Sequence, residues 1–329
     1  MSTTTISITL LVLLYTLGTY QRNDIWSDGT TLWADTTRKS PHKARPYFGL
    51  GYSYMNKGQY NNAIEQLKVS IKINPTYVEA LRHLGISYKN SGLYQEAIKA
   101  FKDILFYNPT SWNTYYNLAN TYNQLGMYNK AIEAYKKAIE LNPHFAKAYN
   151  NLGTIYAQQG LYDLAIVQFK QTLELNRDIY QVYLNLGKAY LKTGMYAKTI
   201  KEMRRLIKLK HNLPSAYYFL GNAYYLQDLP DQAIESYRQS LALEPQQANA
   251  YNNLGCSYYC KGLYQQALEN YQRCLTASPD HPNAHFNLSL LYKEHIRDEK
   301  KTALYLKKAL RLNPDLSQIK NIDQVRIVN

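Results

Sequence analysis

A leucine that recurs every 34 residues constrains the fold of this 329-residue chain more than any other feature. Eight leucines occupy this position: Leu50, Leu84, Leu118, Leu152, Leu186, Leu220, Leu254 and Leu288. A fixed period of this length indicates one supersecondary unit that is copied, in which each copy buries its apolar face against its neighbours. The fold is therefore expected to grow along one axis rather than around a central core.

The copy at residues 112–145 shows the internal structure of the unit. A first helix is predicted by residues spaced at three- and four-residue steps, namely Tyr115, Leu118, Ala119 and Tyr122. A second helix is predicted in the same way by Ala131, Tyr135 and Ala138. Gly126 lies between them, where a helix end often needs a positive φ, and Asn142-Pro143 closes the unit. Each copy is therefore a helical hairpin.

This pattern of aromatic residue, Leu-Gly, Tyr, Ala, aromatic residue, small residue and Pro resembles the tetratricopeptide repeat over residues 44–315. Glycines follow the repeated leucine where a side chain would hold the two helices apart, at Gly85, Gly153, Gly187, Gly221 and Gly255. The resemblance implies an all-α fold, a right-handed superhelical α-solenoid of eight helix hairpins. We expect residues 316–329 to form a tail or a capping helix.

Two copies depart from the pattern at their turns. In the sixth copy Asp228-Leu229-Pro230 replaces the usual Gly-Leu-Tyr. The last copy lacks the turn glycine and holds one extra residue, because Pro314 comes one position late. A polar, irregular final unit is what the end of a solenoid requires.

Residues 1–21 carry no charged side chain, and Ile6 to Tyr20 are nearly all apolar. This run approaches the roughly 20 residues that span a bilayer. It lacks the basic start and the cleavage signal of a secretory leader, so we predict a membrane-anchor helix; the alternative is a hydrophobic cap on the first repeat. Basic residues that follow the run, from Arg22 to Arg45, favour a cytoplasmic location for the repeats.

Residues 22–43 are predicted to be a linker and half of a repeat, because Trp33 falls in the aromatic position of a second helix and Pro41 in the closing position. The junction is also similar to that of polytopic membrane glycosyltransferase-like proteins with C-terminal repeats. That similarity rests on Trp26, Asp28, Leu32, Trp33, Asp35, Thr36, Lys39, Ser40, Pro41, Arg45, Pro46 and Tyr47. It implies that the chain is a detached or accessory part of such a system, with its repeats outside the cytoplasm, so the side of the membrane stays open.

The net charge of +14 indicates anionic partners, and half of that excess lies in the fifth copy. Most of its cations fall on the second helix, at Lys198, Lys201, Arg204, Arg205 and Lys208. Two interpretations stay open for this basic patch: a solvated outer face, or a dock for an acidic partner, a phospholipid surface or a polyanion. No nucleic-acid module is present, so sequence-specific recognition of nucleic acid is not expected.

Asparagine recurs immediately before the repeated leucine, at Asn117, Asn151, Asn185, Asn253 and Asn287. An amide both donates and accepts hydrogen bonds, which suits the backbone of an extended peptide. The series is similar to the asparagine ladder of the O-linked N-acetylglucosamine transferase, which holds substrate peptide, although Gly49, His83 and Phe219 interrupt it. We predict a peptide-binding groove that also includes Tyr116, Asn150, Lys188, Lys192, Tyr218, Asn222 and Asn252. The alternative is that the asparagines bridge adjacent helices.

No catalytic constellation is found in the chain, and no cofactor or metal is expected. Cys256 and Cys260 lie four residues apart, but no second pair of ligands matches their spacing. The sequence favours a membrane-tethered scaffold that binds proteins or peptides, acidic ones included, in its concave groove. A detached part of a glycosyltransferase-like system and a soluble adaptor remain the alternatives.

Overall fold

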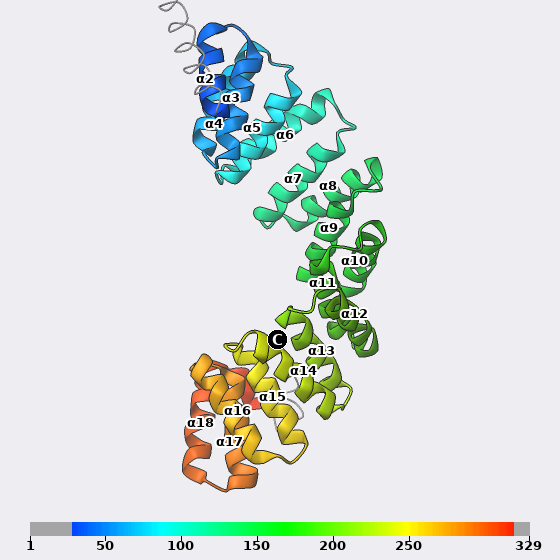
Figure 1. Cartoon of the computed structure of the whole chain (residues 1–329), viewed down its shortest axis with the longest axis vertical. Coiled ribbons are helices and arrows are strands. Elements are labelled where there is room, and N and C mark those ends of the chain that lie inside the picture. Colours follow the sequence, from blue (N-terminus) through cyan, green and yellow to red (C-terminus); the bar gives the residue numbers. More distant parts are fainter. Residues whose placement is uncertain (1–27, 319–329) are drawn as a thin grey trace, which may run out of the picture. The chain divides into compact units, whose positions relative to one another are not determined.

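The computed structural model describes residues 28–318, and all regular secondary structure in that range is helical (Figure 1). The chain forms two compact units, residues 1–148 and 149–329, with the boundary inside helix α9 (Ala146–Gln158). The predicted anchor at residues 1–21 lies outside the described residues. Between residues 28 and 318, no helix combines the length and the apolarity that a membrane crossing requires.

Unit 1 contains the half-repeat helix and three complete hairpins. Its helices are α2 (Gly29–Lys39), α3 (Ala44–Asn56), α4 (Tyr60–Ile73), α5 (Val78–Asn90), α6 (Tyr94–Tyr107), α7 (Trp112–Gln124) and α8 (Tyr128–Leu141). Each first helix packs against its own second helix and against the second helix before it, as α5 does with α6 and α4.

Unit 2 repeats the same packing from α11 onward. Its helices are α10 (Tyr162–Leu175), α11 (Tyr180–Lys192), α12 (Tyr196–Leu209), α13 (Pro214–Leu226), α14 (Pro230–Leu243), α15 (Ala248–Cys260), α16 (Tyr264–Ala277), α17 (Pro282–Leu291) and α18 (Glu299–Leu312), with a π-helical turn η1 (Tyr292–Ile296) and a 3-10 turn η2 (Pro314–Gln318). The described residues thus contain the eight predicted hairpins. The superhelical sense of the complete array stays a prediction.

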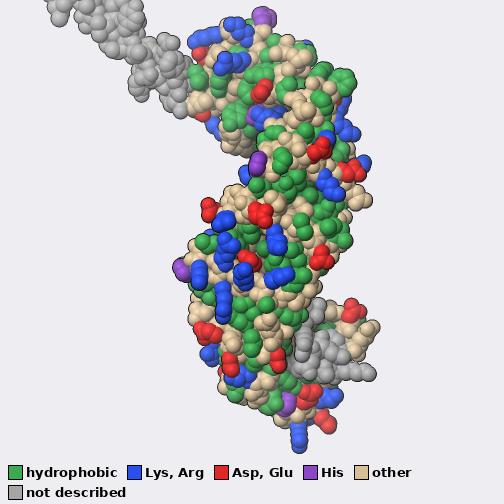
Figure 2. Space-filling view, turned by 90° about the vertical axis from the view of Figure 1, so that its right-hand side faces the viewer, with side chains coloured by type: hydrophobic (Ala, Val, Ile, Leu, Met, Phe, Trp, Pro, Cys, Tyr) green, Lys and Arg blue, Asp and Glu red, His purple; other side chains and the backbone are tan. Residues whose placement is uncertain are grey.

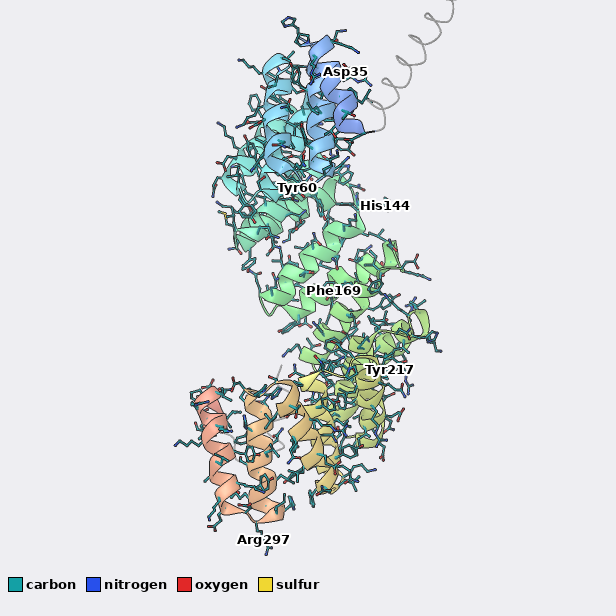
Figure 3. All side chains as sticks on the ribbon, turned by 60° about the vertical axis from the view of Figure 1, so that its left-hand side comes forward. Asp35, Tyr60, His144, Phe169, Tyr217 and Arg297 are labelled. Atoms are coloured by element: carbon teal, nitrogen blue, oxygen red, sulfur yellow. The ribbon has the colours of Figure 1, made fainter. Side chains whose placement is uncertain are left out.

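Glycines after the repeated leucine let the two helices of a hairpin approach closely, as the sequence predicts. A Cβ added at Gly85 would lie 2.5 Å from the ring of Phe101, which is fully buried on α6. Phe169 on α10 (Figure 3) occupies the same place beside Gly153. In the hairpins that have this glycine, a large second-helix side chain therefore packs on the backbone of the first helix.

The turns follow the glycine pattern with two exceptions. Gly194 has a φ of 73°, in the left-handed region, and Asp228 adopts a φ of 60° at the equivalent position one repeat later. This conformation costs an L-residue free energy, although Asp tolerates it better than most residues. Arg297 also has a φ of 60°, at the end of η1 (Figure 3).

The extra residue of the last repeat is accommodated by the π-helical turn. Helix α17 ends at Leu291, and residues Tyr292–Ile296 continue as η1 before α18 begins. A single π-helical turn is the usual way for a helix to absorb one inserted residue. The second helix of the hairpin can therefore still pack on the first, and α17 and α18 are in contact.

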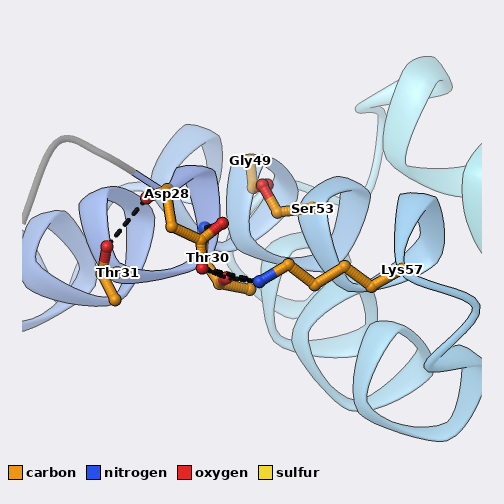
Figure 4. A network of polar contacts seen from close by, with 6 residues as sticks. All are labelled: Asp28, Thr30, Thr31, Gly49, Ser53 and Lys57. Carbon is orange, nitrogen blue, oxygen red and sulfur yellow. Dashed lines mark hydrogen bonds and ion pairs between the residues drawn. The ribbon is translucent and has the colours of Figure 1, made fainter.

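Helix α2 lies within the segment predicted to hold a linker and half a repeat, and it packs on α3. A Cβ added at Gly49 would lie only 2.3 Å from the ring of Trp33, so this ring occupies the space beside the glycine. A polar network fastens the start of α2 (Figure 4): Lys57 Nζ donates to Asp28 Oδ2 at 2.6 Å, and Thr30 Oγ1 donates to the same carboxylate. The hydrogen bond from Lys57, and to a smaller extent the one from Thr30, lowers the pKa of Asp28 to about 2. Asp28 therefore caps α2 as a carboxylate.

Candidate functional site

The predicted groove positions lie on first helices, and consecutive first helices are in contact. In unit 2, α11 contacts α13, α13 contacts α15, and α15 contacts α17. The residue before the repeated leucine is therefore close to the preceding and following first helices. This arrangement decides how much of each asparagine can reach a guest chain.

In unit 2 the asparagines of α13 and α15 bond to one another. Asn253 Nδ2 donates to Asn222 Oδ1 at 3.0 Å and to Tyr218 Oη at 3.3 Å. Tyr237 Oη of α14 donates to the same Asn222 oxygen at 2.8 Å. Burial raises the pKa of Tyr237 well above its usual value, so its hydroxyl remains a donor at neutral pH. Asn222 is 4% exposed and Asn253 is 3% exposed, so this cluster is interior.

The network continues into the last repeat. Asn287 of α17, which has no exposed surface, donates to Asn252 Oδ1 at 3.0 Å and to Cys256 Sγ at 3.3 Å. Asn252 Nδ2 donates in turn to Asn253 Oδ1 at 3.1 Å. Burial raises the pKa of Cys256 to about 12, so the sulfur is a thiol in the packed interior. Among the described residues, no group of His, Cys, Asp and Glu is placed to hold a metal ion.

The predicted guest-binding role is therefore contradicted for Asn252, Asn253 and Asn287, which are buried in this network. Asn222 belongs to the same network but also lines the hollow described below, so its role in binding stays a prediction. The amides of the network donate to one another and to Cys256 within the packed helices, whereas Asn287 Oδ1 is buried with no hydrogen-bond partner among the described residues. The sequence could not separate the two interpretations because a side-chain amide donates and accepts hydrogen bonds. The same chemistry suits a buried bridge between repeats and a bond to the backbone of a bound peptide. The bonds from Asn253 to Asn222 and from Asn287 to Asn252 agree with the alternative that the asparagines bridge adjacent helices.

The other predicted asparagines are partly exposed. Asn117, Asn151 and Asn185 each keep intermediate exposure on α7, α9 and α11. Asn150 Nδ2 donates to Asn151 Oδ1 at 3.3 Å, and Gln181 donates to Asn185 at 3.3 Å. A role of these residues in binding stays a prediction.

Tyr116 belongs to an aromatic group in unit 1. Its ring lies 4.8 Å from the ring of Phe145 and 5.9 Å from that of Tyr135, measured between centroids. The edge-on approach to Phe145 is typical of aromatic packing. Tyr116 is partly exposed, so it has both a packing role and a surface.

The three interruptions of the asparagine series have packing explanations. The ring of Trp33 fills the space beside Gly49, so no side chain fits there. His83 is 7% exposed and lies edge-on to Phe48 and Tyr52, at 5.3 and 5.1 Å. Burial lowers the pKa of His83, which keeps the imidazole neutral inside this aromatic group.

The third interruption, Phe219, forms part of a hollow in unit 2. This hollow has a volume of about 350 Å³ and lies among α11, α13 and α15, lined by Lys188, Leu191, Lys192, Tyr218, Phe219, Asn222, Leu226 and Asn249. It brings together four predicted groove residues, namely Lys188, Lys192, Tyr218 and Asn222. The sequence already contained a sign that Phe219 belongs to a binding surface: an aromatic residue that interrupts a series of asparagines indicates a different local environment.

The hollow combines cations with apolar walls. Lys188 Nζ lies 5.1 Å from the centroid of the Phe219 ring, and the rings of Phe219 and Tyr218 meet edge-on at 5.4 Å. Lys188 and Lys192 are exposed. Among the described residues that line the hollow, none is Asp or Glu. The chemistry suits a ligand that carries both an anion and apolar groups.

The predicted basic patch lies on the other helix of the same hairpin. Lys198, Lys201, Arg204, Arg205 and Lys208 are all exposed on α12. Figure 2 shows a gathering of Lys and Arg side chains on one face of the molecule, with hydrophobic surface between them. None of the five patch residues lines the first-helix hollow, so the two are separate surfaces.

Comparison with protein families agrees with the repeat architecture. Tetratricopeptide repeat models match residues 51–92, 112–145, 146–179, 180–212, 212–280 and 252–316, which together make up more than half of the chain. The chain belongs to the tetratricopeptide repeat family. The segments 112–145, 146–179 and 180–212 each contain one hairpin, so the family models and the observed helices describe the same units there.

Solved tetratricopeptide repeat structures share this fold. A protein from Cytophaga hutchinsonii, known by its C-terminal part, has a TM-score of 0.57 and 20% identity and covers 72% of this chain and 98% of its own. YrrB, described as a tetratricopeptide repeat protein with an unusual peptide-binding site, has a TM-score of 0.51 and 24% identity and covers 57% of this chain and 96% of its own. At these identities the likeness is one of fold alone.

A human protein also matches part of the chain. The protein O-mannosyl-transferase TMTC1 of Homo sapiens is 26% identical over 83 residues, which are 25% of this chain. The match spans 9% of the length of that protein.

Proposed function

We propose that this tetratricopeptide repeat protein is an adaptor that binds an acidic, partly apolar peptide segment of a partner in the hollow among α11, α13 and α15. The observation that carries the proposal is that Lys188 and Lys192 line the same hollow as the rings of Phe219 and Tyr218, with Lys188 against Phe219 and no acid in the lining. Carboxylates of the guest would meet the two ammonium groups, and its apolar side chains would cover Phe219 and Leu226.

The guest is expected to be extended rather than globular. A volume of about 350 Å³ holds a few side chains, not a folded surface. The buried asparagine network behind the hollow keeps α13 and α15 at a fixed spacing, so the wall is already formed before a ligand arrives. Such preorganisation reduces the entropy that binding costs. YrrB, with the same fold and a peptide-binding site in its description, is a precedent.

The first test uses a fluorescein-labelled peptide in which Asp and Glu alternate with Leu, and fluorescence anisotropy as the readout. Lys188→Glu combined with Lys192→Glu replaces two attractions by two repulsions, each worth about 0.2–1 kcal/mol at exposed sites. We expect affinity to fall at least about tenfold. Raising the salt concentration should weaken binding of the parent more than binding of the variant.

The matched control is Lys72→Glu combined with Lys102→Glu, which makes the same change in net charge on exposed residues of unit 1. This control should bind the peptide as the parent does. If both double variants lose affinity equally, general attraction to a basic protein explains the binding and the hollow is not the site.

A second candidate function is a membrane-linked part of a glycosyltransferase-like system, which the residues at the junction suggest. The match to a protein O-mannosyl-transferase agrees with the glycosyltransferase part of that interpretation. In that case residues 1–21 would hold the adaptor at a membrane, as part of a system similar to the human protein. The peptide-binding role needs no anchor, and a soluble adaptor fits the described residues as well. Carbonate extraction of membranes from expressing cells distinguishes the two: an anchored chain should stay in the pellet, whereas release into the supernatant would reject the anchor.

A further inference from the structure

Helix α12 carries a furrow on the side of unit 2 that the hollow does not use. The furrow has a volume of about 820 Å³ and is lined by Ala197, Ile200, Lys201, Arg204, Arg205, Ile207, Lys208, Tyr217 and Leu220. On α13, Tyr217 and Leu220 face the furrow, whereas Tyr218 and Asn222 line the hollow. At 3.6 residues per turn these two pairs fall on opposite sides of the helix. The furrow and the hollow are therefore separate surfaces.

The furrow has a charged ridge beside an apolar floor. Lys201, Arg204 and Lys208 are exposed and spaced at three and four residues, so they form one row along α12, about 10 Å long. Ile200 and Ile207 lie on the flank next to this row, together with Leu220 of α13. Among the described residues that line the furrow, there are four cations and no acid. The single acid of α12, Glu202, lines a different depression with Lys170 and Arg177.

Two of the guanidinium groups are positioned by aromatic rings. Arg204 lies over the ring of Tyr224, at 5.7 Å from its centroid, and Arg205 over that of Tyr183, at 5.4 Å. Both rings are buried, so they do not move freely. A stacked guanidinium keeps its N–H groups available for carboxylates and loses little conformational entropy on binding. Tyr217, which lines the furrow, is labelled in Figure 3.

We propose that this furrow is a second docking site, for an acidic amphipathic α-helix of a partner protein. A helix with Glu or Asp at i, i+3 and i+7 presents its carboxylates at the same spacing as Lys201, Arg204 and Lys208. An adjacent apolar stripe on the same guest helix then covers Ile200, Ile207 and Leu220. The recessed apolar floor favours a helix over a lipid surface, because flat headgroups reach the ridge but not the floor.

This site goes beyond the peptide-binding role proposed for the hollow and does not depend on it. A partner that engaged both surfaces would gain from effective concentration, since the two lie on opposite sides of one helix.

The test uses a fluorescein-labelled model helix of about four turns, with Glu in one row and Leu in the neighbouring row. Anisotropy is measured on the full chain. We expect Lys201→Glu, Arg204→Glu and Lys208→Glu together to lower affinity by at least about tenfold. Ile207→Gln, which leaves every charge in place, should lower it by about threefold or more because the floor loses apolar contact. Circular dichroism checks that both variants keep their helices.

The matched control combines Lys72→Glu, Lys102→Glu and Lys136→Glu, which changes the net charge equally on exposed residues of unit 1. The control should bind the model helix as the parent does. Equal binding by the α12 triple variant would overturn the proposal. Binding to phosphatidylserine-containing vesicles and to duplex DNA is measured alongside. If the triple variant loses binding only to the vesicles or only to the DNA, the proposal is also overturned, since the patch would then bind a lipid surface or a polyanion. The alternating acidic peptide should still bind the triple variant, which separates this site from the hollow.

Discussion

Tyr237→Ala is expected to lower the free energy of unfolding of unit 2 by about 3–5 kcal/mol. Tyr237 has no exposed surface, and a Cβ added at Gly221 would lie only 2.6 Å from its ring. Truncation therefore leaves a cavity between α13 and α14 that glycine cannot fill. The same change removes the hydroxyl that donates to Asn222. Urea unfolding followed by circular dichroism measures the loss.

Tyr237→Phe separates the ring from the hydroxyl. It keeps the packing and removes one hydrogen bond, so we expect a loss of about 1 kcal/mol, because Asn222 Oδ1 still accepts from Asn253. A Phe variant as unstable as the Ala variant would show that the polar network, not the ring, supports the hairpin. An Ala variant within about 1 kcal/mol of the parent would contradict the packing account altogether.

Gly85→Val is expected to destabilise unit 1 by about 1–3 kcal/mol. A Cβ at this position would lie 2.5 Å from the ring of Phe101, and that ring is fully buried and cannot move aside freely. Helix propensity acts in the opposite direction, because Gly is less favourable than Val in a helix by a few tenths of a kcal/mol. The steric effect is larger, so the net change is a loss. Thermal and urea unfolding both report it.

Gly85→Ala is the matched control, and another repeat of this chain already has alanine at the same position. The third repeat already has Ala119 in this position, with no exposed surface, beside the buried Tyr135. Replacing Gly by Ala in a helix stabilises the helix by up to about 1 kcal/mol, which offsets part of the cost of the steric clash with Phe101. We therefore expect the Ala variant to lie between the parent and the Val variant. A Val variant as stable as the parent would mean that the hairpin does not need this close approach.

The candidate site was only partly predictable. The hollow contains four residues that the groove prediction named, because helical periodicity places Lys188, Lys192, Tyr218 and Asn222 on first helices. One ring of its aromatic wall was missed, since Phe219 was treated as a break in the asparagine series. The furrow was missed for a different reason. Its charged ridge follows from the spacing along α12, but its floor comes partly from α13, and spacing within one helix cannot show that.

The sequence by itself determined the repeat length, the hairpin in each copy, the turn positions and the extra residue of the last repeat. These features depend on contacts between residues close in the chain or one period apart, which periodicity records directly. Only the tertiary structure decided whether the asparagines face a guest or each other. An amide can satisfy either partner, and Asn222, Tyr237 and Asn253 meet only when three successive helices are packed together.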